Sequence, residues 1–258
     1  MNILIIGFGD IGKEVGARLG KEGHRVTALR RADTGYHDSI QADISKPLSC
    51  RKDFDYVLYI LTPSSRDEEG YKAVFDVGLQ NALAYFSQSI FMFISSSVVY
   101  GENEGAWVDE ETPTSQDSMR SRILSQAEER VLATHDKNVV LRLSGIYGRG
   151  NNYLLEKLQR GEGIQQIPPY YTNRIHKEDC VGAIVFIMIK QIEGSVKERI
   201  FNVTDSSPLA MYEVATLLAQ KEGLGEVKKA EGTSQNKRIS NQRLLDLGYT
   251  FVYPSYVG

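Results

Sequence analysis

The sequence predicts an α/β protein, in which a doubly wound parallel sheet is followed by a small C-terminal α/β lobe. Three observations support this fold class. Apolar runs typical of buried strands alternate with amphipathic helices, a glycine-rich turn joins the first strand to the first helix, and the regular alternation loosens after about residue 150. Strict alternation of strands and helices favours a parallel sheet with helices on both faces.

The N-terminal half supplies most of the predicted strands and helices. Residues 2–6, "NILII", form a continuous aliphatic run, as expected of a strand covered on both faces. Ile11, Val15 and Leu19 then form one apolar helical stripe that ends near Gly23. Further strands are predicted at 25–30, 55–63, 89–97 and 138–148, further helices at 67–86 and 120–135, and a loop rich in Gly, Pro, Ser and acids at 101–117.

The C-terminal part is less regular. Residues 163–176, "GIQQIPPYYTNRIH", are predicted to be an irregular crossing segment. Helices at 180–189 and 211–223 enclose a short strand at 199–204, and the tail at 237–258 is expected to form a small helix and a final strand or coil. Because no disordered spacer separates the halves, we expect a nucleotide-binding domain at 1–165 and a substrate lobe at 166–258 that packs on the main sheet and is not an independent domain.

Composition argues against several classes of function. The chain has 258 residues, a formal net charge of −3 and no basic block, so nucleic acid and anionic membranes are not expected partners. Cys50 and Cys180 are far apart and are interpreted as reduced buried thiols, and the four histidines show no metal-ligand spacing, so no metal site is predicted. No signal peptide or apolar run long enough to span a membrane is visible, which leads us to expect a soluble cytoplasmic protein.

The sequence "GFGDIG" at residues 7–12 predicts a dinucleotide-binding turn. It lies between the first strand and the first helix, the context that the Rossmann fingerprint requires. Gly7 would permit the tight turn, Gly9 would let the backbone approach a pyrophosphate, and Gly12 would let the helix pack on the strand. Asp10 and Ile11 complete the turn at the helix start, where free amide groups favour a phosphate. The alternative is a tight glycine turn that binds nothing.

The end of the second strand favours NADP over NAD. NAD-binding chains place an acid here for the ribose hydroxyls, whereas this chain has Arg30 and Arg31. Guanidinium groups suit a 2′-phosphate because they form bidentate, charge-assisted hydrogen bonds. Asp33 follows closely, so NAD stays an alternative. Asp43, Leu61 and Thr62 follow strand-like runs and are further candidate cofactor contacts; Asp43 would bind the adenine amino group or be an ordinary loop acid.

Several segments together resemble the extended short-chain dehydrogenase/reductases, the NAD-dependent epimerase/dehydratase family. The matching stretches are "IIGFGDIG", "FISSSVVYG" (93–101), "VDEETP" (108–113), "LRLSGIYG" (141–148) and "RIHKEDCVGAI" (174–184). Their order and spacing are far more specific than the glycines alone. Because the family usually has GxxGxxG, the GxGxxG spacing points to its atypical, YeeZ-like members.

The resemblance implies a catalytic serine after the fourth long strand. Ser97, with Ser96 as second choice, would hydrogen-bond the reacting oxygen of the substrate, unless these serines only bind loop backbone. Tyr100 in "VVYG" is a family-typical position that could supply a phenol, although such tyrosines more often pack in loops. Arg142 is expected to brace the sheet edge, and Arg174, His176 and Asp179 to anchor the crossing segment and cap the next helix.

The Tyr-x-x-x-Lys pair of the family is missing from the helix that should carry it, "SQDSMRSRILSQAEERV". The nearest polar pairs at that spacing are Ser118 with Arg122 and Ser121 with Ser125. Arg122 could bind ribose hydroxyls, but a guanidinium stays protonated and cannot replace a tunable lysine. A literal YxxxK occurs at Tyr153–Lys157, on a different predicted helix, and is interpreted as coincidence.

Two functions therefore stay open from the sequence. The first is an NAD(P)-dependent oxidoreductase or epimerase that acts on a small hydroxyl, carbonyl or sugar-like substrate. The second is a non-catalytic sensor or regulator that binds NADP(H), which the missing pair favours. A homodimer through the helix at 118–135 is suggested by the resemblance.

Overall fold

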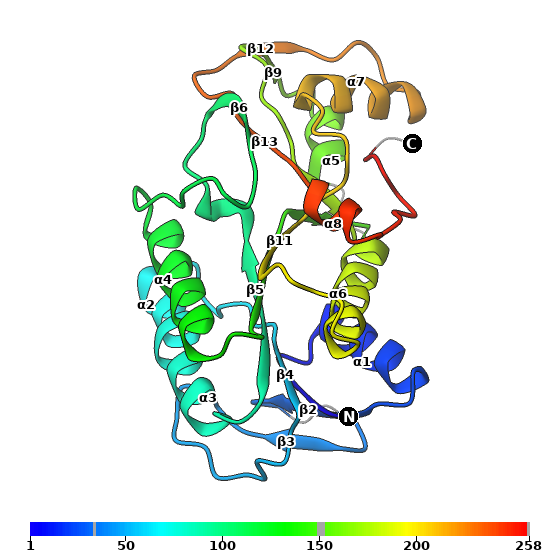
Figure 1. Cartoon of the computed structure of the whole chain (residues 1–258). Coiled ribbons are helices and arrows are strands. Elements are labelled where there is room, and N and C mark those ends of the chain that lie inside the picture. Colours follow the sequence, from blue (N-terminus) through cyan, green and yellow to red (C-terminus); the bar gives the residue numbers. More distant parts are fainter. Residues whose placement is uncertain (33–34, 149–152, 257–258) are drawn as a thin grey trace. The chain divides into compact units, whose positions relative to one another are not determined.

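A computed structural model describes residues 1–32, 35–148 and 153–256. Its main feature is a parallel sheet of 7 strands in the order β11-β7-β5-β4-β1-β2-β3 (Figure 1). The strands are β1 (Asn2–Ile6), β2 (Arg25–Arg30), β3 (Ser39–Gln41), β4 (Tyr56–Tyr59), β5 (Ile90–Ser96), β7 (Val139–Leu143) and β11 (Ile200–Val203). This order confirms the Rossmann-type fold predicted from the sequence.

Helices cover both faces of the sheet, as the strand–helix alternation predicts. Figure 1 shows α1 and α6 on one face and α2, α3 and α4 on the other. The residues of β1 from Ile3 to Ile6 and all four of β4 are fully buried between these layers. The helices are α1 (Asp10–Lys21), α2 (Glu68–Lys72), a π-helical stretch (Ala73–Gly78), α3 (Leu79–Tyr85), α4 (Met119–Thr134) and α6 (Lys177–Ile192).

The chain divides into two compact units that interleave along the sequence. The first comprises residues 1–99, 114–142 and 181–201, and the second comprises 100–113, 143–180 and 202–258. The sequence led us to expect one change of domain at residue 165, and that division stays a prediction.

The second unit is built from short parallel strand pairs and three helices. The elements are β6 (Glu104–Val108) with β13 (Asn236–Ile239), β8 (Gly145–Tyr147) with β10 (Arg174–His176), β9 (Ile164–Ile167) with β12 (Lys229–Glu231), α5 (Tyr153–Gln159), α7 (Met211–Lys221) and α8 (Gln242–Asp246). Its own apolar core contains Leu154, Ile164, Val214, Ala215, Ala219 and Val227.

Two of the sequence-based assignments were wrong. The predicted loop at 101–117 contains strand β6, and the predicted irregular segment at 163–176 contains β9 and β10. Each of these strands has only three to five residues and pairs with a distant part of the chain. Among the described residues, no helix has both the length and the hydropathy needed to cross a bilayer.

Candidate functional site

The predicted cofactor residues of the first unit gather where the parallel strands end. Strand β1 pairs with β2 on one side and with β4 on the other, so the strand order reverses beside β1. In open α/β sheets, ligands bind at the carboxyl ends of the strands at such a switch point. Gly7 follows β1, Arg30 ends β2, Leu61 follows β4, and Ser96 ends β5.

The three glycines of the turn differ in what surrounds the place that a side chain would occupy. Gly7 has a φ of 105°, and a Cβ there would lie 1.9 Å from the carbonyl oxygen of Ile60. A Cβ on Gly12 would lie 2.4 Å from the carbonyl oxygen of Gly7. Packing of the turn against β4 and α1 therefore excludes any side chain at Gly7 and Gly12.

Gly9 differs because, apart from its chain neighbours, no atom of the described residues lies within 4 Å of the position that its Cβ would take. It is the N-cap residue of α1 and has no side chain of its own to cap the helix. Buried Ile11 and exposed Asp10 begin the helix, whose first amide groups have no intrahelical acceptor. The residues present fit a diphosphate, because Gly9 leaves room above amides that would donate to it.

The paired arginines lie beside this turn. Nη1 of Arg30 donates to the carbonyl oxygen of Phe8, within the turn itself, at 3.5 Å. Arg31 is exposed, and its carbonyl oxygen accepts from Gln41 Nε2 at 3.0 Å. Asp33, the alternative contact for NAD, lies outside the described residues.

The remaining predicted cofactor residues follow β3 and β4. Asp43 Oδ1 accepts hydrogen bonds from the hydroxyl of Ser45 at 2.7 Å and from its amide at 3.0 Å. These bonds, the hydroxyl's first, hold the pKa of Asp43 below its usual range. Leu61 Cδ2 lies 3.1 Å from the place that a Cβ on Gly7 would occupy, so Leu61 adjoins the turn, and Thr62 is exposed.

The three serines after β5 have distinct surroundings. Ser95 is buried, and its hydroxyl donates to Glu128 Oε1 at 2.5 Å. Ser96 Oγ accepts from the amide of Val98 at 3.3 Å and so supports the 3₁₀ turn at Ser97–Val99. Among the described residues, nothing hydrogen-bonds the half-buried hydroxyl of Ser97. Ser97 is therefore the serine of the three whose hydroxyl forms no hydrogen bond within the described part of the chain.

Ser118 and Arg122, the polar pair of helix α4, both make contacts that stabilise the helix or its packing. Ser118 caps the helix by accepting from the amide of Ser121 at 3.0 Å. Arg122 is 43% exposed and pairs with Glu68 on α2, with 3.9 Å between Nη2 and Oε1. No tyrosine or lysine occurs in α4.

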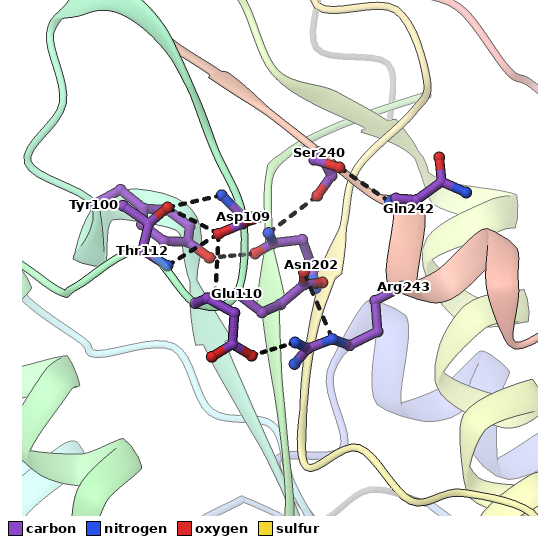
Figure 2. A network of polar contacts seen from close by, with 9 residues as sticks. Tyr100, Asp109, Glu110, Thr112, Asn202, Ser240, Gln242 and Arg243 are labelled. Carbon is purple, nitrogen blue, oxygen red and sulfur yellow. Dashed lines mark hydrogen bonds and ion pairs between the residues drawn. The ribbon is translucent and has the colours of Figure 1, made fainter.

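Tyr100 belongs to a polar network inside the second unit (Figure 2). Its side chain is 2% exposed, and its hydroxyl donates to Asn202 Oδ1 at 2.8 Å. The backbone amide of Asn202 donates to Glu110 Oε1 at 2.7 Å, and Glu110 Oε2 lies 3.9 Å from Arg243 Nε. Burial raises the pKa of Glu110. These contacts favour a structural role for Tyr100, and its catalytic role stays a prediction.

The crossing segment is anchored by His176 and Asp179. His176 Nδ1 accepts from the amide of Glu178 at 3.2 Å at the start of α6, and its ring packs against Tyr253 with 3.7 Å between centroids. Asp179 accepts from the hydroxyl of Tyr249 and from the amides of Val252 and Tyr253. This arrangement agrees with the anchoring and capping roles that the resemblance implies.

The second unit also encloses a cavity of about 450 Å³ that the sequence did not lead us to expect. Its lining residues are Ile146, Tyr147, Tyr153, Leu154, Lys157, Ile164, Gln165, Tyr170, Arg174, Met211 and Tyr256. Two of them are cations, four are tyrosines, and none of those that the structure describes is acidic. Tyr153 and Lys157, which we interpreted as a coincidental pair, both line this cavity from α5.

Comparison with solved structures identifies the family. A protein of Methylobacillus flagellatus assigned to the NAD-dependent epimerase/dehydratases is 30% identical, with a TM-score of 0.80 over 99% of this chain and 94% of that one. The chain belongs to the NAD-dependent epimerase/dehydratase family. The family resemblance seen in the sequence is thereby confirmed, while the assignment to its atypical, YeeZ-like members stays a prediction.

More distant epimerases have the same fold. The UDP-glucuronic acid 4-epimerase of Bacillus cereus, solved with NAD, is 18% identical, with a TM-score of 0.78 over 98% of this chain and 94% of that one. A human epimerase family protein solved with NADPH is 20% identical, with a TM-score of 0.74 over 99% of this chain and 96% of that one. No family model and no curated protein matches the chain.

Proposed function

We propose that this protein binds NADP(H) at the turn of residues 7–12 and acts as an oxidoreductase or epimerase on a small hydroxyl or carbonyl compound. The observation that carries this proposal is the open side of Gly9 at the N-terminus of α1, next to Arg30. Family membership supports a nicotinamide dinucleotide, and the relatives solved with NAD and with NADPH make either form suitable. The two arginines favour the form with a 2′-phosphate.

Each proposed contact has one task. The amides of Gly9 to Gly12 bind the diphosphate, Arg30 and Arg31 bind the 2′-phosphate, and Asp43 accepts from the adenine amino group. Leu61 and Thr62 line the site beside β4, and Arg122 binds the nicotinamide ribose. When bound, the cofactor supplies hydride transfer, and the protein orients it. Ser97 then donates a hydrogen bond to the reacting oxygen, and Ser96 is the second choice.

The proton must be handled without a phenol and lysine pair on α4. We place this protein among the atypical, YeeZ-like members of the family on that ground and on its glycine spacing. Neither Ser118, which caps α4, nor Arg122 is an acid near neutral pH. Ser97 with a water molecule, or with Tyr100, would then relay the proton.

The cavity of the second unit supports a substrate that carries an anionic group. Arg174 and Lys157 supply two positive charges to it, and tyrosine hydroxyls supply hydrogen-bonding groups around apolar Leu154 and Ile164. Polar groups that converge on a cavity of this size are typical of small-ligand sites. We therefore propose a hydroxylated carboxylate or phosphate as the substrate class.

A regulatory protein that senses NADP(H) is the second candidate function. The absence of tyrosine and lysine from α4 favours it. The two functions differ in turnover, so the protein is incubated with NADP⁺ or NADPH and a panel of hydroxy acids, keto acids and sugar phosphates. Net cofactor oxidation or reduction with any member, or conversion of a member to its epimer, supports the enzyme, whereas tight NADPH binding with neither reaction supports the sensor.

Cofactor binding is tested by calorimetric titration with NADPH and NADH. We expect NADPH to bind at least about tenfold more tightly, because of the additional phosphate contacts. Gly9→Leu should lower both affinities strongly without unfolding the protein, since its side chain would fill the space proposed for the diphosphate. Gly20→Leu on the same helix is the matched control, because its Cβ position is equally open. Unchanged affinity in Gly9→Leu would overturn this binding site.

A further inference from the structure

Two buried polar atoms without a hydrogen-bond partner belong to residues that are joined through their backbones. Among the described residues, Arg174 Nε and Asp205 Oδ2 have no partner. The amide of Asp205 donates to the carbonyl oxygen of Arg174 at 2.6 Å, and Thr204 Oγ1 donates to the same oxygen at 3.1 Å. Arg174 Nε is a donor and Asp205 Oδ2 is an acceptor. Leaving a buried donor or acceptor unpaired costs free energy, so the presence of both calls for an explanation.

Arg174 connects this pair to the cavity of the second unit. Its side chain lines the cavity, and its guanidinium carbon lies 4.7 Å from the centroid of the Tyr256 ring, which also lines it. Asp205 does not line the cavity and is only 1% exposed. Arg174 is therefore the residue through whose charge Asp205 could influence the cavity.

The carboxyl of Asp205 is held in surroundings that oppose its charge. Burial raises the pKa of Asp205 from 3.8 to about 7, against the amide of Ser207 and the charge of Arg174, which lower it. The neighbouring charge of Asp179 raises it further. Oδ1 accepts from the Ser207 amide at 3.1 Å, so Oδ2 is the oxygen left to take a proton.

We propose that Asp205 is a positioning residue for Arg174, and that binding of an anion in the cavity is accompanied by uptake of one proton from solvent at Asp205 Oδ2. This inference rests on the proposed function, because it requires that the cavity take an anionic substrate. An anion bound by Arg174 weakens the attraction between its guanidinium and the Asp205 carboxylate. The carboxylate then gains more from protonation, and by linkage a protonated Asp205 favours the anion.

The other charged and titratable groups around Asp205 do not take over this role. Asp179, at the start of α6, receives three hydrogen bonds from Tyr249, Val252 and Tyr253. Tyr147, on β8, has its pKa raised by burial first and then by the charges of Asp205 and Asp179, so its phenol stays neutral.

The test uses tartrate, a hydroxylated dianion whose charge is constant from about pH 6 to about pH 8.5. Calorimetric titration of the full chain should show tartrate binding that weakens about tenfold over this range. Near pH 7.5, titrations in two buffers of different ionisation enthalpy should show net uptake of about half a proton per tartrate, because Asp205 is already partly protonated before binding.

Variants separate the role of Asp205 from that of the cavity. Asp205→Asn keeps an oxygen for the Ser207 amide, and its affinity at about pH 8.5 should equal that of the wild type at about pH 6, without proton uptake. Asp246→Asn, at an exposed acid of α8, is the matched control and should behave as wild type. Arg174→Gln should abolish binding, and circular dichroism checks that each variant is folded.

The possible failures are distinguishable. Tartrate binding that is independent of pH, or that keeps its pH dependence in Asp205→Asn, would overturn the role of Asp205 and leave the anion site intact. No tartrate binding at any pH, or undiminished binding in Arg174→Gln, would overturn the anionic substrate class in the proposed function and this inference with it.

Discussion

Glu128 and Arg142 form a buried ion pair, with 2.7 Å between Glu128 Oε2 and Arg142 Nη2 and side-chain exposures of only 3% and 4%. Arg142 Nε also donates to Glu128 Oε2 at 3.1 Å, and Ser95 donates to Oε1. The pair thus joins α4 to β7 and to the end of β5, where the candidate serine Ser97 follows. Arg142 braces the sheet edge, as the sequence led us to expect.

We predict that Glu128→Gln lowers the free energy of unfolding by about 3–5 kcal/mol, because it removes the carboxylate that pairs with the buried charge of Arg142. Urea denaturation measures the change. Glu129→Gln, at the next and exposed position of α4, is the control and should stay within about 0.5 kcal/mol of wild type. Equal stabilities of the two variants would contradict the importance of the buried pair.

A second prediction concerns the turn after β1. Gly7→Ala should destabilise the protein by more than about 2 kcal/mol, because it combines a positive φ with a clash against Ile60. Gly23→Ala is the control, since Gly23 also has a positive φ, 84°, but an open Cβ position. It should cost only about 1 kcal/mol, the part due to backbone conformation. Similar unfolding temperatures of the two variants would show that the backbone at Ile60 moves away from the added Cβ at little cost in free energy.

The sequence predicted the central sheet well because its signal is local. Strands β1, β4 and β5 each contain a continuous apolar run, and buried parallel strands need no more specific pattern. The turn at Gly7 was equally readable, because a positive φ and close packing on β4 both demand glycine at one position. The residues expected to follow the strand ends therefore fell on one edge of the sheet.

The second unit could not be predicted in the same way. Strand β6 pairs with β13 and β9 with β12, so these two short strands are each defined by a partner more than 60 residues away. The cavity depends on the same distant pairings, and no local motif marks Asp205 as the neighbour of Arg174. A basic residue among tyrosines in "PPYYTNRIH" was the available signal for an anion site.

Arg31→Ala tests the cofactor preference. Because Arg31 is exposed and its side chain forms no ion pair within the described residues, its removal should leave stability unchanged. NADPH affinity should fall about tenfold, the effect of one charge-assisted contact, while NADH affinity stays constant. Parallel titrations with both nucleotides measure this difference. Equal losses for NADPH and NADH would place Arg31 away from the 2′-phosphate.

Ser97→Ala tests the proposed hydrogen bond to the reacting oxygen. Any turnover found for the wild type should fall about a hundredfold, because one donor to a developing charge is lost. Ser96→Ala is the comparison; the Ser96 hydroxyl supports the 3₁₀ turn by accepting from the amide of Val98, and we expect its loss to have a smaller effect on turnover. NADPH affinity should not change in either variant. A larger loss of turnover in Ser96→Ala than in Ser97→Ala would mean that Ser96 is the donor to the reacting oxygen.

The pH dependence of stability tests the surroundings of Asp205 without any ligand. Its pKa is 3.8 when solvated and about 7 in the folded protein, so the folded state binds more protons between these values. Stability from this group is therefore fully present below about pH 4 and is lost as the pH rises to about 7, by up to about 4 kcal/mol.

Asp205→Asn cannot ionise, so its stability relative to the wild type should rise steadily from about pH 4 to about pH 8. Urea denaturation of both proteins at each pH gives this difference, in which the contributions of all other titrating groups cancel. Asp246→Asn, at an exposed site, should show no such trend. A difference between Asp205→Asn and wild type that is constant with pH would mean that the Asp205 carboxyl titrates as a solvated acid, and the proposed proton uptake would then have no source.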